Sequence, residues 1–528
     1  MKYLTWCFLL SFWSSVATAQ MMWKSNPPKD RDAVREWVAA AVVPVSSFSA
    51  DHQMDRVKIL GRAAVIDGVL GDEAAYRSHI AAAKAVYTSG MEALGASLMN
   101  TEARSYLIYT KVLDNDLPAA QRIASERDAA LKGPQMVQYA VWEKAPLLMA
   151  LCRQKQFDKA ITIAQAQPEA VKARCLDMVA TELVRDGAST RAASLVSDSS
   201  RGATIVSVER LQALLEKGNW AEARPLIPVS WAMLAVQILV QQGKFAEATE
   251  AAELSSESMG RDSLLGRIAG AKVKAGDLAG AKAMLGRVKD QSYARHSIAL
   301  QLLDKGQVQD AMAMVAEVSS SARQLSDFAA RLAKCSEPAK AELFIEKLTD
   351  PHALRPVQLA TAAAYLRAGN QTDYQRLLQP VLDAARAGSL TAPEAESELR
   401  TMVDLLGGDD LPPLREVWQA ISDRRVREGM VLRVIAEQLE RHGADAGRIL
   451  FDQAVSTGSV GSRSEGLRMI TWTLAKENRK ADAIKMLAAE KDPVVKAYGC
   501  MGFAENLAGL AVANNGHMSF PVRRPPSF

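Results

Sequence analysis

Apolar residues along this chain recur at the spacing of an α-helix. In one segment after another they stand three and four positions apart, which places them together on one face of a helix. No run of alternating polar and apolar residues is long enough to predict a β-strand. The pattern therefore predicts an all-α protein.

A short motif recurs along the chain every 25 to 33 residues between Lys155 and Gly369. It consists of Gly, a polar residue, an apolar residue, two variable residues and Ala. This regular spacing predicts a series of similar structural units. The clearest copies are 218–223, 243–248, 276–281 and 306–311, weaker copies begin at Asn115, Lys155, Gly187, Ser336, Gly369 and Asn478, and further turns are expected at Gly443 and near Gly71 and Gly408.

The motif has the composition of a tight turn between two helices. Gly, or Asn in two copies, can adopt the left-handed conformation that ends a helix. The Ala five positions later is expected where the second helix crosses the first, because only a small side chain allows close approach. The motif therefore predicts stacked helix hairpins. Ala stands at this place in residues 120, 160, 192, 223, 248, 281, 311, 341 and 483.

These hairpins resemble the tetratricopeptide repeat, a helix–turn–helix unit of about 34 residues. The resemblance covers roughly residues 100–490 and is strongest from 205 to 315. It implies a right-handed α-α superhelix, or solenoid, of helix-turn-helix repeats. The chain departs from the family because many units are shorter, the closing proline is mostly absent, and Ala often replaces Gly in the first helix.

The repeat pattern also predicts how the chain is divided. The repeats are expected to be flanked by irregular helices that cap them and to be interrupted once, near Pro412 and Pro413. The expected segments are a signal peptide at 1–19, an N-terminal cap of irregular helices at 20–100, tetratricopeptide-like repeats at 101–379, an irregular helical break at 380–415, further repeats and a C-terminal cap at 416–511, and a flexible tail at 512–528.

The first twenty residues have the composition of a secretory signal peptide. Lys2 precedes an apolar stretch from Tyr3 to Trp13, and Ala17-Thr18-Ala19 forms an A-x-A cleavage pattern before Gln20. The alternative is a buried N-terminal helix. No later apolar run is long enough to predict a membrane span. We therefore expect an exported protein, in the periplasm or outside the cell.

The net charge argues against one class of partner, and the cysteine spacing argues against disulfide bonds. The chain has 528 residues, with 64 Lys and Arg against 60 Asp and Glu, so its formal charge is only +4. A nucleic-acid-binding protein usually carries a larger basic surplus, so no nucleic-acid partner is expected. The spacing of Cys152, Cys175, Cys335 and Cys500 predicts buried free thiols rather than disulfides.

Motifs that would assign a reaction are missing from the sequence. It contains neither of the glycine-rich nucleotide-binding loops, G-x-x-x-x-G-K-[ST] and G-x-G-x-x-G. It also lacks the G-x-S-x-G nucleophile turn and the H-E-x-x-H metal motif. The histidines are scattered, and no Cys/His cluster predicts a zinc site. We therefore predict no catalytic residues, no metal, no cofactor and no enzymatic activity.

The resemblance to tetratricopeptide arrays implies a concave groove lined by the first helix of each hairpin. It places groove residues 13, 10 and 6 positions before each turn. Such grooves bind another protein or an extended peptide, so the predicted function is an exported interaction scaffold. The alternatives are an envelope hydrolase acting on cell-wall or polysaccharide material, and a structural spacer. The candidate binding residues are Trp142, Tyr293, His296, Arg433, Arg468 and Trp472, and the alternative for Trp142 and Trp472 is burial between units.

Overall fold

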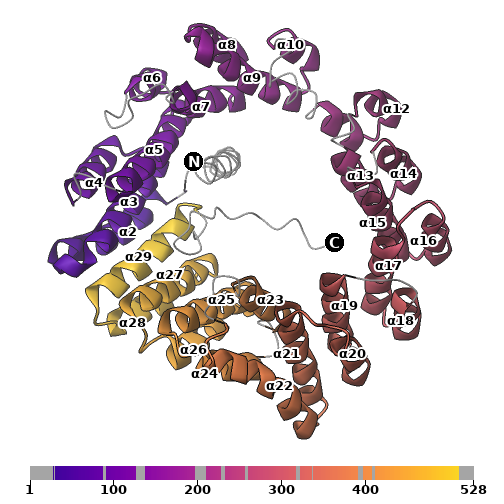
Figure 1. Ribbon diagram of the computed structural model, residues 1–528. Coiled ribbons are helices and arrows are strands. Elements are labelled where there is room, and N and C mark those ends of the chain that lie inside the picture. The colour runs from indigo at the N-terminus through magenta and orange to yellow at the C-terminus, as the bar shows by residue number, and fades with distance from the viewer. Residues whose placement is uncertain are drawn as a thin grey trace. The chain divides into compact units, whose positions relative to one another are not determined.

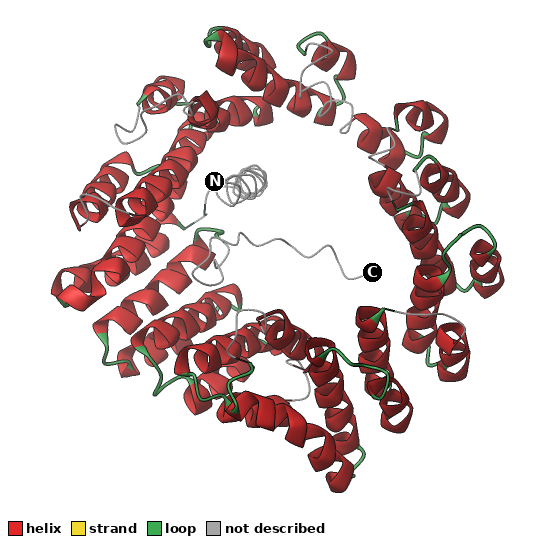
Figure 2. Cartoon of the chain, in the orientation of Figure 1, coloured by secondary structure: helices red, strands yellow, loops and turns green. Residues whose placement is uncertain are grey.

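The computed structural model describes most of the chain. It covers residues 28, 30–86, 91–126, 137–196, 210–227, 232–255, 260–316, 321–335, 337–390, 396–406 and 411–510. Within these residues the secondary structure is helical and includes no strand (Figure 2). The prediction of an all-α protein is confirmed. The expected signal peptide and tail lie outside the described residues.

The chain folds into two compact units, each described here by itself. Unit 1 combines both ends of the chain, residues 1–206 and 438–528. Its helices are α2 (Arg31–Val42), α3 (Gln53–Leu70), α4 (Glu73–Val86), α5 (Met91–Leu113), α6 (Leu117–Ser125), α7 (Val137–Arg153), α8 (Phe157–Gln165), α9 (Glu169–Arg185), α10 (Ser189–Ala193), α26 (Ala444–Ala454), α27 (Val460–Lys476), α28 (Lys480–Ala489) and α29 (Pro493–Leu507), with short 3-10 turns η1 (Val43–Ser47) and η2 (Ala50–His52).

Unit 2 comprises residues 207–437. The helix α25 (Arg424–His442) crosses the boundary between the units. The other helices of unit 2 are α12 (Trp220–Ala223), η4 (Arg224–Leu226), α13 (Ala232–Gln241), α14 (Phe245–Glu253), α15 (Arg261–Lys274), α16 (Leu278–Leu285), α17 (Ser292–Asp304), α18 (Val308–Ala316), α19 (Ala322–Lys334), α20 (Pro338–Ile345), α21 (Pro351–Arg367), α22 (Gln371–Arg386), α23 (Glu396–Leu406) and α24 (Leu411–Ala420).

The predicted turn residues have the left-handed backbone that the motif requires. At Gly276, with φ 94°, the glycine N–H donates to the Val273 carbonyl at 3.0 Å, and the next N–H donates to the Lys272 carbonyl at 2.8 Å. Asp277 then caps the second helix by accepting a bond from the Gly280 N–H at 2.7 Å. Positive φ also occurs at Gly71, Asn115, Lys155, Gly187, Gly218, Gly243, Gly306, Gly369 and Asn478. Gly443 has a φ of 82° but an extended ψ of −172°, so its backbone lies outside the left-handed helical region. Ser336 and Gly408 lie outside the described residues.

The alanines five positions after the turns are completely enclosed. A helix can approach another this closely only where no larger side chain separates the two. The relative exposure is 0% at residues 120, 160, 192, 223, 248, 281, 311, 341 and 483.

Within each unit, the first helices of successive hairpins pack side by side (Figure 1). In unit 1, α3, α5, α7 and α9 follow one another in this way, and in unit 2 the order is α13, α15, α17, α19, α21 and α23. The contact between α15 and α17 is so close that a Cβ on Gly266 would lie 3.0 Å from the Ala294 Cα and 2.7 Å from the Tyr293 ring. Glycine at this position therefore sets the spacing of these two helices.

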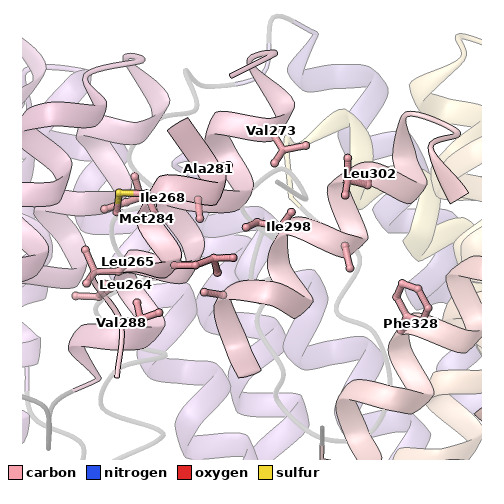
Figure 3. Packing of buried hydrophobic residues seen from close by; sticks show 14 of the residues in the cluster. Leu264, Leu265, Ile268, Val273, Ala281, Met284, Val288, Ile298, Leu302 and Phe328 are labelled. Carbon is pink, nitrogen blue, oxygen red and sulfur yellow. The ribbon is translucent and has the colours of Figure 1, made fainter. Parts of the chain in front are cut away.

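The core of unit 2 is a continuous layer between first and second helices. Figure 3 shows Leu265 and Ile268 of α15 with Met284 of α16 and Ile298 of α17. These residues stand at helical spacing, and each is nearly or fully buried. None of the described helices is long and apolar enough to cross a membrane.

We predict that Ala281→Trp destabilises unit 2 by overpacking the crossing of α15 and α16. The expected loss is about 1–3 kcal/mol of unfolding free energy, measured by urea denaturation. The matched control is Ala283→Trp, because Ala283 is exposed on the same helix. Equal stability of the two variants would show that the crossing tolerates a large side chain.

Candidate functional site: a buried charge cluster where the chain ends meet

The two ends of the chain meet in unit 1. The C-terminal helix α29 packs against α27, and also against α2 and α3 from the N-terminal end (Figure 1). Side chains of α3, α5, α27 and α29 form a group of polar and mostly charged residues, which we call the junction cluster: Asp55, Arg62, Glu102, Glu465, Arg468, Tyr498 and Glu505.

Glu505 is the centre of the junction cluster. Its side chain has no exposed surface, although it carries a carboxylate. Arg62 of α3 donates from Nε to the Glu505 Oε1 at 2.7 Å. Arg468 of α27 donates from Nη2 to the same oxygen at 2.6 Å and from Nε to Oε2 at 2.8 Å. One carboxylate thus joins two arginines that are 406 residues apart in the sequence (468 − 62 = 406).

Small residues on α29 allow the helices to approach closely enough for these bonds. A Cβ on Gly502 would stand 2.2 Å from the backbone oxygen of Arg468. One turn earlier, the Gly499 carbonyl accepts a bond from the Thr471 Oγ1 at 2.7 Å. Any larger side chain at Gly502 would push α29 away from α27 and lengthen the bonds of Glu505.

The remaining charges surround this centre and are partly exposed. Glu102 of α5 accepts a bond from Arg62 Nη1 at 3.3 Å. Glu465 lies 3.6 Å from Arg468 Nη1, and its Oε2 is buried without a hydrogen-bond donor. The Tyr498 hydroxyl donates to Asp55 at 2.9 Å, so α29 is tied to α3 a second time.

The environment shifts the pKa values of Glu505 and of the half-buried Glu465 in opposite directions. Burial disfavours the charged form of Glu505, but Arg468 and Arg62 outweigh it and hold the pKa of Glu505 below its usual value. Burial raises the pKa of Glu465, and the negative charge of Glu505 adds to this effect. Burial likewise raises the pKa of Tyr498 well above its usual value. Glu505 is therefore held as an anion, whereas ionisation of Glu465 is disfavoured.

The geometry around Glu505 is better suited to holding helices together than to transferring a proton. An enclosed carboxylate with a lowered pKa and two bound guanidinium groups is a poor general acid or base. Among the described residues, no group of three or more His, Cys, Asp or Glu side chains could hold a metal ion. The junction cluster can hold α3, α27 and α29 in register, because the Glu505 carboxylate has fixed partners on both other helices.

Unit 2 contains a second buried carboxylate with the same kind of partner. Glu398 of α23 accepts bonds from Arg355 Nε at 2.6 Å and Arg355 Nη2 at 2.7 Å. His352 lies 2.9 Å from the same carboxylate. The pair joins α21 to α23, which are neighbouring first helices in the order given above. Each unit thus uses an arginine and a buried glutamate to join its helices.

The structure places one predicted binding residue, Arg468, in the junction cluster, and a second, Trp472, on the same helix α27. Arg468 is only 6% exposed and bonds Glu505. Trp472 is half-buried, and its Nε1 donates to the Leu510 carbonyl at 2.8 Å. Both residues therefore have internal partners.

The other four predicted residues lie elsewhere. Tyr293 is half-buried against Gly266. His296 is buried, with Nε2 3.5 Å from Asp327 and no hydrogen-bond partner for Nδ1. Arg433 is half-buried on α25. Trp142 lies on α7, and its side chain is outside the part of the chain that is described.

The four cysteines in the described residues are unpaired, and Cys152, Cys175 and Cys500 are buried as predicted. The prediction of burial is wrong for Cys335, which is half-buried near the end of α19. Burial raises the pKa of Cys152 and of Cys175 to about 12 and that of Cys500 to about 11. Thiols with such pKa values are protonated at neutral pH and are poor nucleophiles. Their role is therefore packing.

Sequence reasoning did not identify Arg62 or Glu505. A signal was present, because Glu505 stands alone among apolar and small residues in Cys500–Leu510, where a charge on a buried helix requires a partner. The sequence does not indicate which residue is this partner, because Arg62 is 443 positions from Glu505. The chain matches no known protein-family model and no curated protein.

We predict that Glu505→Gln destabilises the protein strongly, because it leaves Arg62 and Arg468 buried without a counter-charge. Removing one partner of a buried ion pair costs about 3–5 kcal/mol, measurable by urea denaturation. The matched control, Glu102→Gln, changes a partly exposed partner of the same Arg62 and should cost less than about 1 kcal/mol. Similar losses in both variants would contradict the central place of Glu505.

The two glutamates should also give opposite pH dependences. Because the pKa of Glu505 is lowered, its stabilising effect is present above the ordinary pKa of 4.5 and is lost as the pH falls through the lowered pKa. Because the pKa of Glu465 is raised, the wild type should lose stability relative to Glu465→Gln as the pH rises above 4.5. Thermal unfolding of both Gln variants between pH 3 and pH 7, a range of about four units around the carboxyl pKa, measures this. A constant offset for Glu465→Gln would rule out the shift.

Proposed function

We propose that this protein is an exported helical-repeat scaffold that binds another protein or an extended peptide. In this proposal the hairpins form a right-handed superhelix of the tetratricopeptide-like type, and the first helices line its groove. Removal of residues 1–19 would leave the mature protein in the periplasm or outside the cell.

The observation that carries this proposal is the regularity of the hairpins. The same left-handed turn and the same enclosed alanine recur in both units. Such repetition aligns the first helices side by side, so each contributes one stripe of side chains to a common face. A surface built in this way is extended, which suits an extended partner better than a small molecule.

Side chains on the first helices of unit 2 support a binding role. Met233 of α13 stands at a groove position, 10 residues before Gly243, and is 58% exposed. Tyr293 of α17 stands at another, 13 residues before Gly306, and is half-buried. On α15, Arg267 is exposed beside the groove position Gly266. Aromatic, methionine and arginine side chains are the types that protein interfaces favour.

We predict that Arg267→Glu weakens partner binding, because it reverses an exposed charge beside the proposed groove position Gly266. A peptide selected from a random library against the wild-type protein should bind this variant about tenfold or more weakly, by isothermal titration calorimetry. The matched control is Lys282→Glu, which makes the same charge change at an exposed site on the second helix α16. Equal affinities of the two variants would place the binding surface elsewhere.

We predict that the mature protein begins at Gln20, because the A-x-A pattern ends at Ala19. Amino-terminal sequencing of the protein purified from its source checks this. Replacing both Ala17 and Ala19 by Leu should block the cleavage and leave a longer chain. A mature protein that retains Met1 would contradict export by a cleaved signal.

A further inference from the structure

The first described helix, α2, is attached to the chain differently from the other helices of unit 1. It is followed by the short turns η1 and η2 instead of a second helix that packs back on it. Its main contact is with α29, from the other end of the chain. α29 ends as the first helix of a hairpin does, with Gly509 at φ 73°. α2 therefore supplies α29 with the helix that completes its packing.

A single apolar stripe holds α2 on this face. Val34, Trp37, Val38 and Ala41 are buried at the i, i+3, i+4, i+7 spacing of one helix face. The Trp37 ring stacks on Phe503 of α29, with ring centroids 4.2 Å apart and an angle of 24° between the planes. This is the arrangement of an amphipathic helix bound in a groove.

The polar contacts of α2 lie at the surface. Arg31 pairs with Asp114 at 3.4 Å, Arg35 with Asp72 at 3.7 Å, and Glu36 with Lys480 at 3.0 Å. Exposed pairs of this kind add little to stability. The Trp37 Nε1 is buried without an acceptor, which opposes the burial of the ring.

The contacts of α29 with its other neighbours are of a different kind. Glu505, Tyr498 and Gly499 all form buried or partly buried hydrogen bonds with α3 or α27. α29 can therefore stay in place through these bonds when α2 leaves. Its apolar face around Phe503 would then lose the cover of α2.

We propose that α2 is a displaceable strap over a helix-binding groove on α29, and that the α2 of a second copy of this chain can occupy the groove. The occupant follows from the observed contact, because a second copy presents the same Val34, Trp37, Val38 and Ala41 stripe. This inference concerns the junction of the chain ends and does not rest on the proposed function.

The first test is hydrogen exchange of the full chain carrying Trp37→Ala. Exchange in residues 31–42 should accelerate about 100-fold or more, as expected for loss of a large buried side chain. Exchange in 493–507 should rise less, because the junction cluster remains. The control Trp220→Ala, in unit 2, should leave both segments unchanged. Equal acceleration in α2, α27 and α29 would mean that α2 does not separate from the rest, and would overturn the proposal.

The second test is rescue by a peptide of residues 30–48. Added in excess to the Trp37→Ala protein, the wild-type peptide should bind and restore protection of 493–507, whereas the same peptide with Ala in place of Trp37 should not. Failure of the wild-type peptide to bind would overturn the proposal. If Trp37→Ala does not fold, the milder Val34→Ala serves for both tests.

Light scattering of the wild-type protein tests the exchange of α2 between two copies. It should show a dimer that the added peptide dissociates, and a monomer at every protein concentration would overturn this exchange.

Discussion

The close approach of two helices at an enclosed alanine is the contact on which each unit depends. A left-handed residue such as Gly276 reverses the chain, and Ala281 then lets the second helix lie directly on the first. Because the contact is small and repeated, no single crossing has to supply much free energy. Larger side chains such as Ile268 and Met284 fill the space beside it. Stability is therefore distributed along each unit rather than concentrated in one contact.

The buried carboxylates add specificity to this repeated packing. Apolar stripes of Ala, Leu and Val are similar from one helix to the next, so they do not by themselves fix which helices become neighbours. Glu505 with Arg62 and Arg468, and Glu398 with Arg355, form contacts that only the correct neighbours can complete. Burying each charge is costly without its partner. A wrong pairing of helices would therefore leave ions uncompensated.

The helical class, the turns and the crossings could be predicted from the sequence, because they depend on neighbours within about one repeat. The residue type and the regular spacing predict a turn at Gly218 and Gly243 and a helix crossing at Ala281. The junction cluster could not be predicted, because its bonds join residues from opposite ends of the chain. The predicted groove positions did not reliably indicate which side chains are exposed. Arg468 stands at a predicted groove position, yet the structure gives it an internal partner in Glu505. A spacing rule cannot distinguish the two outcomes, since the same helix position can face solvent or a neighbouring helix.

The pairing of α3 with α29 has a consequence for how the protein is made. The Arg62–Glu505 bond spans 443 positions, so α2 and α3 lack one partner, α29, until that much more of the chain has been made, whereas α3 can pack on α4 and α5 much earlier. Until α29 exists, the Trp37 ring lacks its stacking partner Phe503, and apolar surfaces left uncovered in partly folded chains are prone to aggregate. Contacts between such distant positions also slow folding. Unit 1 therefore reaches its native packing only once α29 is available, although α3, α4 and α5 can associate before it.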